Sequence, residues 1–241
     1  MKAFFIPLGR WFGIRVYLHA LVLLFFAFFG GWTAWAWIAG GAEFAHRLPE
    51  SLGLLLVVLA LFVSMSLHEF GHAFAAKARG LRATRIDLAI VGRTYFEGHS
   101  NSKHDEWIVA LGGPLVNIGI AGVLLPFLLQ NSGVLDGSTL EMRASFSTWP
   151  GIAAWICILN AAMAAFNLVP LFPMDGGRVV TGLLSVCMDW KRGVRIVTAY
   201  SIMLGAGLVA WAGVDLLIED FVVGSWHVAG LLIGGTAISA S

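Results

Sequence analysis

Charged residues are scarce in this chain. Asp, Glu, Lys and Arg together make up 12% of its 241 residues, whereas an average soluble domain has about 25%. Hydrophobic residues reach 59%, compared with about 45–50% in soluble domains. This composition excludes an ordinary soluble protein and indicates a polytopic protein of the lipid bilayer. The formal net charge of +1 argues against a nucleic-acid partner, because nucleic acids call for a strongly basic surface.

Cysteine is also rare, and a signal-peptide cleavage site is lacking. The two cysteines, Cys157 and Cys187, both lie in apolar stretches. Such a pair predicts buried reduced thiols and indicates neither a disulfide framework nor a cysteine metal site. Residues 1–29 are basic and then strongly apolar, with no small-residue cleavage site after a short apolar region. We therefore expect a retained first helix and not a removed signal peptide.

Long apolar segments are abundant. A helix needs about 20 residues to cross a bilayer, and several segments reach this length. The sequence predicts an all-α polytopic membrane protein with about six transmembrane helices. These would form a single membrane-embedded domain over residues 1–241, with a core at 10–190 and C-terminal helices at 196–239. The predicted spans are 16–40, 53–78, 107–130, 150–170 and 196–218, with a shorter apolar stretch at 176–189 and a last one at 221–239.

The distribution of Lys and Arg predicts the orientation in the membrane. The N-terminal arm carries three of them and residues 77–106 carry six, whereas residues 41–52 and 131–149 carry one each. Cytoplasmic loops are enriched in Lys and Arg, so the N-terminus and the 77–106 loop are predicted to be cytoplasmic. The stretch 176–189 leaves two alternatives open. Either it is re-entrant and the basic cluster after it stays inside, or it is a short span and the cluster lies outside.

The 77–106 loop contains a β-prone segment. Residues 85–98 read RIDLAIVGRTYFEG, in which apolar and polar residues alternate around Gly92-Arg93. This pattern predicts a small β-hairpin between the second and third transmembrane helices. Because an isolated hairpin is only marginally stable in water, we expect it to pack against the membrane domain.

Ionisable residues interrupt the second apolar segment. Residues 68–72 read HEFGH, and each ionisable group at bilayer depth costs about 2.5–3.5 kcal/mol on insertion scales. In a helix, His68 and His72 share one face, and Glu69 is an i,i+3 neighbour of His72. Two imidazoles can hold a zinc ion while the carboxylate reaches a water molecule beside it. The alternative is a proton relay or a polar contact between helices.

A catalytic zinc ion needs a third protein ligand. Residues 167–178 read NLVPLFPMDGGR and follow the fourth apolar segment. Pro170 and Pro173 end the helix there, and Gly176-Gly177 permits a tight turn. Asp175 is therefore a carboxylate at a helix break, on the same predicted side of the membrane as the two histidines.

Four motifs together resemble the site-2 protease family of intramembrane zinc metalloproteases. This family pairs HExxH with an N-x-x-P-x-x-P-x-D-G motif, which HEFGH at 68–72 and the segment 167–178 match in order. EWIVALGGPLVN at 106–117 resembles the family's Gly-Pro-x-x-Asn helix, and FGIRVYLH at 12–19 resembles its N-terminal segment. The likeness covers roughly residues 10–190 and includes no PDZ or CBS domain, so gating by such domains is not expected.

The resemblance implies a role for each motif residue. His68, His72 and Asp175 would be the ligands of one zinc ion. Glu69 would be the general base that activates water and then protonates the leaving amine. Asn167 would be catalytic, donating a hydrogen bond to the scissile carbonyl or its oxyanion.

The resemblance also implies the substrate class, namely transmembrane or membrane-proximal segments of other proteins, such as membrane-tethered regulators. Asn117 matches the Gly-Pro-x-x-Asn position and is predicted to bind substrate. For Asn117 and Asn167 alike, a hydrogen bond between helices is the alternative. A strand edge within 85–97 could hold an unwound substrate by β-addition, with Ile86, Leu88 and Ile90 as the predicted binding positions.

The function predicted overall is an intramembrane zinc endopeptidase acting in regulated intramembrane proteolysis. A bacterial or archaeal plasma membrane is expected, with the active site toward the cytoplasm. One alternative is a catalytically silent homologue that binds membrane helices as a regulator or chaperone. The intact set of His68, Glu69, His72 and Asp175 argues against it. A transporter would show related halves, and none is visible. Membrane zincins that process prenylated proteins use a downstream Glu as third ligand, whereas this chain offers Asp175.

Overall fold

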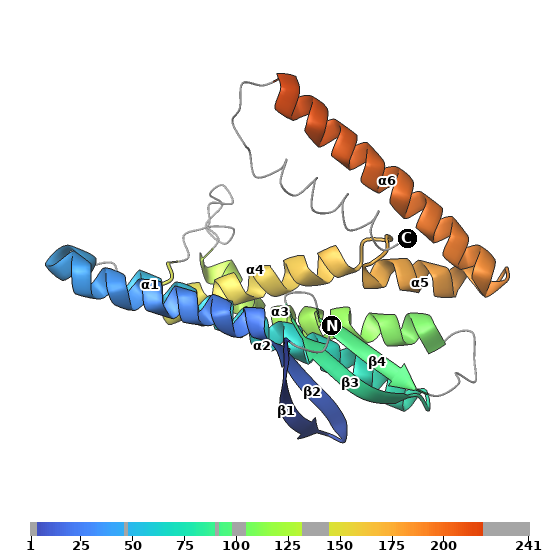
Figure 1. Cartoon of the computed structure of the whole chain (residues 1–241), viewed down its shortest axis with the longest axis horizontal. Helices are drawn as coiled ribbons and strands as arrows, with labels where there is room; N and C mark the ends of the chain where they lie inside the picture. Colours follow the sequence, from blue (N-terminus) through green and yellow to red (C-terminus); the bar gives the residue numbers. More distant parts are fainter. Residues whose placement is uncertain (1–3, 46–47, 90–91, 98–104, 132–144, 219–241) are drawn as a thin grey trace. The chain divides into compact units, whose positions relative to one another are not determined.

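The computed structural model describes residues 4–45, 48–89, 92–97, 105–131 and 145–218 (Figure 1). The chain divides into two compact units, Met1–His99 with Gly112–Ala164 and Ser100–Leu111 with Ala165–Ser241. The elements in chain order are β1 (Phe5–Trp11), β2 (Ile14–His19), α1 (Ala20–Ala45), α2 (Leu48–Ala78), β3 (Arg82–Leu88), β4 (Arg93–Glu97), α3 (Asp105–Asn131), α4 (Trp149–Asn167), α5 (Asp175–Leu184) and α6 (Trp190–Ile218).

The helices confirm a mostly helical membrane protein, but not six spans. Among the described residues, four helices are long and apolar enough to cross a membrane: Leu48–Ala78, Asp105–Asn131, Trp149–Asn167 and Trp190–Trp211. Helix α1 has 26 residues, Ala20–Ala45, and its part Ala20–Ala36 counts by the same measure as a shorter apolar helix. Helix α5 has ten residues, which is about 15 Å, or half the hydrocarbon thickness. The predicted segment 221–239 lies outside the described residues.

The β-structure is larger than the predicted hairpin. β3 and β4 form that hairpin, but β2 pairs with β3 in parallel, and β1 pairs with β2 antiparallel. The result is a four-stranded sheet in the order β1-β2-β3-β4 (Figure 1). The segment predicted as a helix from residue 16 is therefore a strand up to His19. Its apolar residues run directly into α1, and a short apolar run does not distinguish strand from helix by periodicity.

The turn between β1 and β2 has unusual backbone geometry. Trp11 pairs with Ile14 across it, and the two residues between them, Phe12 and Gly13, have φ of 53° and 85°. Positive φ at both central residues is what a type I′ hairpin turn requires. The Phe12 ring contacts the rings of Phe70 and Phe74 on α2 in edge-to-face geometry. The turn is thus anchored on the helix that carries the HEFGH motif.

One face of the sheet packs on the C-terminal half of α2. The buried cluster joins Val16 and Leu18 of β2 with Ile86 of β3 and Phe70 of α2. Within β3, the Arg85 side chain donates a hydrogen bond to the Asp87 carboxylate. This bond raises the pKa of the guanidinium above its ordinary value. The apolar face therefore fixes the sheet beside the stretch of α2 that holds the two histidines.

Helices α2 and α3 approach each other closely through glycine. A Cβ built at Gly71 would lie 2.3 Å from the Gly112 carbonyl oxygen, and a Cβ at Gly112 would lie 2.5 Å from the Gly71 oxygen. Small residues at such a crossing let two backbones come into contact within a membrane. The glycine inside HEFGH thus makes room for a neighbouring helix.

The two cysteines differ in exposure. Cys157 is buried, as predicted, whereas Cys187 is exposed. The prediction for Cys187 was wrong because α5 ends at Leu184. The residue therefore lies in the turn that follows α5 and not inside an apolar span.

Candidate metal centre

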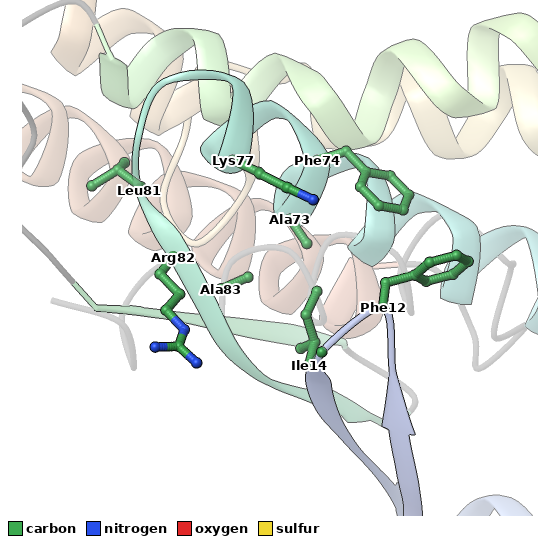
Figure 2. Close-up of a pocket in the computed structure, with 9 residues that line it drawn as sticks. Phe12, Ile14, Ala73, Phe74, Lys77, Leu81, Arg82 and Ala83 are labelled. Carbon is green, nitrogen blue, oxygen red and sulfur yellow. The ribbon is translucent and has the colours of Figure 1, made fainter.

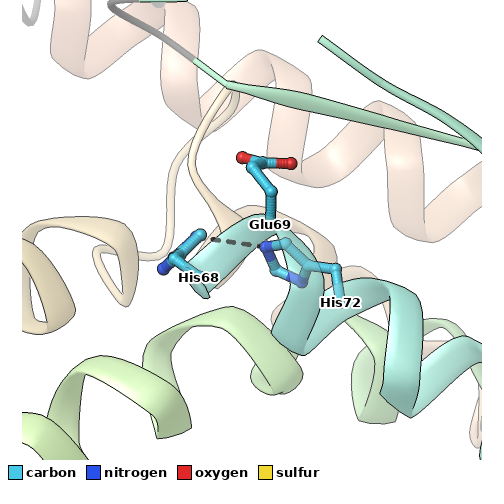
Figure 3. Close-up of side chains that lie close together, drawn as sticks. All are labelled: His68, Glu69 and His72. Atoms are coloured by element: carbon cyan, nitrogen blue, oxygen red, sulfur yellow. Dashed lines mark hydrogen bonds between the residues drawn. The ribbon is translucent and has the colours of Figure 1, made fainter. Parts of the chain in front are cut away.

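The HEFGH motif lies in the C-terminal third of α2, where three ionisable side chains are buried together. His68, Glu69 and His72 are 5%, 6% and 4% exposed. Each offers one potential ligand atom, and these atoms lie within 4.8 Å of one another (Figure 3). The Nε2 atoms of the two histidines are 3.1 Å apart. The structure therefore brings together three of the sequence-predicted site residues.

The His68 imidazole is oriented by α3 and α4. Its Nδ1 lies 2.6 Å from the Oδ1 of Asn117, and Asn117 Nδ2 donates to Asn160 Oδ1 over 2.9 Å. Asn117 and Asn160 are both completely buried. This confirms that Asn117 hydrogen-bonds between helices, and its predicted contact with substrate stays a prediction. Asn160 was missed by the sequence analysis, although a lone Asn inside an apolar span is itself a signal of a polar contact.

Gly113 of α3 covers the two histidines. Its backbone N–H donates to His72 Nδ1 over 3.3 Å. A Cβ built at Gly113 would lie 2.5 Å from the Nε2 atoms of both His68 and His72. The missing side chain thus leaves space where the two potential ligand atoms converge.

Glu69 is held by the sheet. The Thr94 hydroxyl on β4 donates to Glu69 Oε2 over 2.7 Å and lies 3.2 Å from the backbone oxygen of Glu69. In Figure 3 the Glu69 side chain rises away from the two imidazoles toward the neighbouring strand. Gly92 also faces the carboxylate, since a Cβ there would lie 2.4 Å from Oε1. Thr94 was not singled out from the sequence, and Gly92 only as a residue of the predicted turn, because their places beside Glu69 depend on where the hairpin packs.

The histidine pair fits a zinc ion. Zn–N bonds of about 2.0–2.1 Å in a tetrahedral site place two nitrogen ligands about 3.3 Å apart, close to the observed 3.1 Å. His68 presents Nε2 while its Nδ1 is engaged by Asn117. Catalytic zinc sites in other proteins also use two imidazoles and one carboxylate as their protein ligands. The residues present therefore suit the metal.

Asp175, the predicted third ligand, belongs to the second unit. It is buried and is the first residue of α5. The loop after α4 folds back over that helix start, since a Cβ built at Gly176 would lie 2.2 Å from the Val169 carbonyl oxygen. This close approach explains the need for glycine directly after Asp175. The ligand role of Asp175 stays a prediction.

The remaining predicted residues have different outcomes. Asn167 is the last residue of α4 and is partly buried, and its catalytic role stays a prediction. Ile86 and Leu88 lie in β3, which is paired on both sides, and both belong to the buried core. They therefore offer no free strand edge. The free edge within the predicted range 85–97 belongs to β4, which is an outer strand of the sheet. Ile90 lies outside the described residues.

A separate cavity lies beside the far end of α2. It has a volume of about 260 Å³ and is lined by the β1–β2 turn, by Phe74 and Lys77 of α2, and by the start of β3 (Figure 2). None of His68, Glu69 and His72 is among its lining residues. The cavity is therefore distinct from the histidine cluster.

Replacing Gly113 tests the geometry around the histidines. We expect Gly113→Ala to weaken zinc binding about 10–100-fold, the range known for changes beside metal ligands. The added methyl group would sit 2.5 Å from both Nε2 atoms and displace one imidazole. The measurement is zinc affinity by competition with a chelator. The matched control is Gly119→Ala on the same helix, where a Cβ meets nothing within 4 Å. Equal affinity in both variants would contradict the described geometry.

Comparisons with known proteins find relatives among peptidases. The profile of peptidase family M50 matches residues 56–210. A zinc metalloprotease of Methanocaldococcus jannaschii is 28% identical over 87% of this chain and 56% of its own length. Stage IV sporulation protein FB of Bacillus subtilis is 25% identical over 73% of this chain and 57% of its own length. The chain thus spans little more than half of these two relatives.

A solved structure is similar over nearly the whole chain. The site-2 protease from Methanocaldococcus jannaschii superposes with a TM-score of 0.59 at 25% sequence identity. The match covers 98% of this chain and 95% of the other.

Proposed function

Because the chain belongs to peptidase family M50, whose profile covers residues 56–210, we propose that it is an intramembrane zinc endopeptidase of the site-2 protease type. The observation that carries the proposal is the buried cluster of His68, Glu69 and His72 on an apolar helix. Ionisable side chains in such a helix mark functional sites. The whole of residues 1–241 would act as a single membrane-embedded protease domain.

One zinc ion would be held by His68, His72 and Asp175. When bound, zinc supplies Lewis acidity, which polarises a carbonyl and makes water a better nucleophile at neutral pH. The Glu69 carboxylate takes the proton of the attacking water and later delivers it to the leaving amine. Thr94 donates to Oε2 of Glu69 and so leaves Oε1 as the proton acceptor. Asn167 donates a hydrogen bond to the oxygen of the scissile carbonyl as negative charge develops on it.

The substrate would be a transmembrane or membrane-proximal segment of another protein, such as a membrane-tethered regulator. The orientation proposed from the basic loops has the N-terminus and the active site toward the cytoplasm of a bacterial or archaeal plasma membrane. Helix α5 is too short to cross the membrane alone, which favours the re-entrant alternative for residues 176–189. An unwound substrate would add as a strand beside β4.

The experiment is cleavage of a single-span reporter protein by the purified chain in liposomes. We expect cleavage to stop when a zinc chelator is added and to return when zinc is restored, because the metal site provides the reactivity. Zinc bound at one ion per chain would accompany activity. Cleavage that persists at full rate in the chelated, zinc-free protein would contradict the proposal.

Proline substitutions on β4 test substrate binding by strand addition. The backbone N–H groups of adjacent residues in a strand point to opposite sides of it. Of the two variants Tyr95→Pro and Phe96→Pro, one therefore removes an N–H group from the free outer edge of β4. The other removes an N–H group that is directed toward β3. We expect the outer-edge variant to keep its fold and to raise KM for the reporter about tenfold, the effect of losing about 1.4 kcal/mol of binding. The measurement is KM and kcat beside thermal unfolding. An unchanged KM in a folded outer-edge variant would rule out the β4 edge.

A further inference from the structure

A chain of hydrogen-bonded side chains joins α2, α3 and α4 behind the histidine cluster. His68 Nδ1 contacts Asn117 Oδ1 at 2.6 Å, and Asn117 Nδ2 donates to Asn160 Oδ1 at 2.9 Å. Asn160 Nδ2 then donates to the backbone oxygen of Ile156 at 2.8 Å and to Ser64 Oγ at 3.1 Å. The four side chains of this hydrogen-bond network, those of Ser64, His68, Asn117 and Asn160, are all buried. All of these residues belong to the first unit.

The backbone oxygen of Ile156 determines which groups donate and which accept along this hydrogen-bond network. A carbonyl oxygen can only accept, so the Asn160 atom 2.8 Å away must be the NH₂ group. The Asn160 oxygen therefore faces Asn117, and it can only accept as well. Asn117 must then present its NH₂ group to Asn160, which turns its own oxygen toward His68.

The direction determines which nitrogen of His68 carries the proton. Facing an acceptor at 2.6 Å, Nδ1 of His68 is the protonated nitrogen. In a neutral imidazole the other nitrogen then has the lone pair, so Nε2 can ligate a metal. This assignment concerns His68; at His72, the Nδ1 atom lies 3.3 Å from the Gly113 backbone nitrogen.

We infer that Asn160, acting through Asn117, is a positioning residue that holds His68 in the tautomer able to ligate zinc. The inference rests on the proposed function, since it concerns the same metal site. Partners of this kind, which accept a hydrogen bond from the far nitrogen of a histidine ligand, fix ring orientation and raise ligand basicity. A purely structural bond between α3 and α4 would need paired polar atoms but would not require this direction toward His68.

The test compares two substitutions at Asn160 in the purified full chain. Asn160→Leu removes the acceptor and leaves the Asn117 amide able to turn over. Asn160→Asp, buried and hence protonated, keeps an oxygen toward Asn117 and an O–H toward Ile156. We expect Co²⁺ and Zn²⁺ affinities about 10–100-fold lower in the Leu variant, the range for outer partners of a metal ligand, and within about threefold of the parent in the Asp variant.

A matched control removes a different contact between α3 and α4. Cys157 lies one turn before Asn160 and is buried, and its thiol donates to the Ala121 backbone oxygen at 3.2 Å. We expect Cys157→Ala to leave metal affinity and the visible absorption bands of bound Co²⁺ unchanged. The Leu variant should change those bands because a histidine ligand is misoriented.

Several outcomes overturn the inference. It fails if Asn160→Leu binds Co²⁺ as tightly as the parent, or if Asn160→Asp is as weak as Asn160→Leu. A measurement on the unmodified, metal-free protein does not depend on whether the variants fold. Nitrogen NMR of ¹⁵N-labelled histidine should show His68 protonated at Nδ1, and protonation at Nε2 would overturn the inference. If the parent chain binds no zinc and cleaves nothing, it is the proposed function that fails.

Discussion

Replacing Glu69 by Gln is expected to lower kcat for reporter cleavage by about 10²–10⁴-fold, the usual contribution of a general acid–base group. Gln has the same shape, and its amide oxygen can still accept from the Thr94 hydroxyl, which lies 2.7 Å from Oε2 in the parent. It cannot take a proton from water, so the chemistry is lost while the site is kept. Zinc content should stay at the parental value because Glu69 is not one of the predicted ligands.

The control for this result is Glu97→Gln. Glu97 is an exposed carboxylate at the end of β4, the strand that also carries Thr94. We expect full activity in this variant, since it changes the same chemical group near the same hairpin without touching the histidine cluster. Cleavage by Glu69→Gln at a rate near that of Glu97→Gln would remove Glu69 from the mechanism.

Replacing Asp175 by Ala is expected to have the second-largest effect, a loss of zinc affinity of more than about 100-fold. Changes next to metal ligands already cost about 10–100-fold, and the loss of a ligand should exceed that range. Cleavage should fall in parallel, because a site with two histidines alone lacks the three protein ligands of a catalytic zinc site. The measurement is zinc content after dialysis against a weak chelator, with cleavage measured on the same samples.

A structural role for Asp175 is the competing explanation. A carboxylate in the first turn of α5 is favoured by the helix dipole, so its removal could simply loosen the helix. Asp189→Asn provides the comparison. Asp189 is an exposed acidic residue directly before α6, and its carboxylate accepts a hydrogen bond from the Lys191 backbone N–H. If Asp175→Ala binds zinc like Asp189→Asn, Asp175 is not a ligand.

Much of the helical framework could be predicted from the sequence, because the ends of a long apolar segment mark approximately where a membrane helix begins and ends. The predicted span 107–130 corresponds to α3 at Asp105–Asn131, and the predicted span 150–170 corresponds to α4, which ends at Asn167 before Pro170. The i,i+4 spacing of His68 and His72 likewise determines that they share a helix face. These features depend on local sequence alone.

The features that were missed depend on contacts between distant segments. Pairing of β2 with β3 joins Arg15 to Arg85, and no local pattern indicates a parallel pairing over that separation. For the same reason the sequence analysis placed substrate-binding positions at Ile86 and Leu88 of β3, although β3 is paired with β2 on one side and with β4 on the other. Asn160 and Thr94 acquire their roles only through packing against α3 and α2 respectively.

The central claim is that one zinc ion is bound by two histidines and a carboxylate in this chain. Zinc K-edge X-ray absorption on the purified protein tests it most directly. We predict one zinc per chain, with nitrogen and oxygen ligands at about 2.0–2.1 Å and the multiple-scattering pattern of two imidazoles. A chain that retains no zinc, or a spectrum with sulfur at about 2.3 Å from Cys157 or Cys187, would contradict the claim.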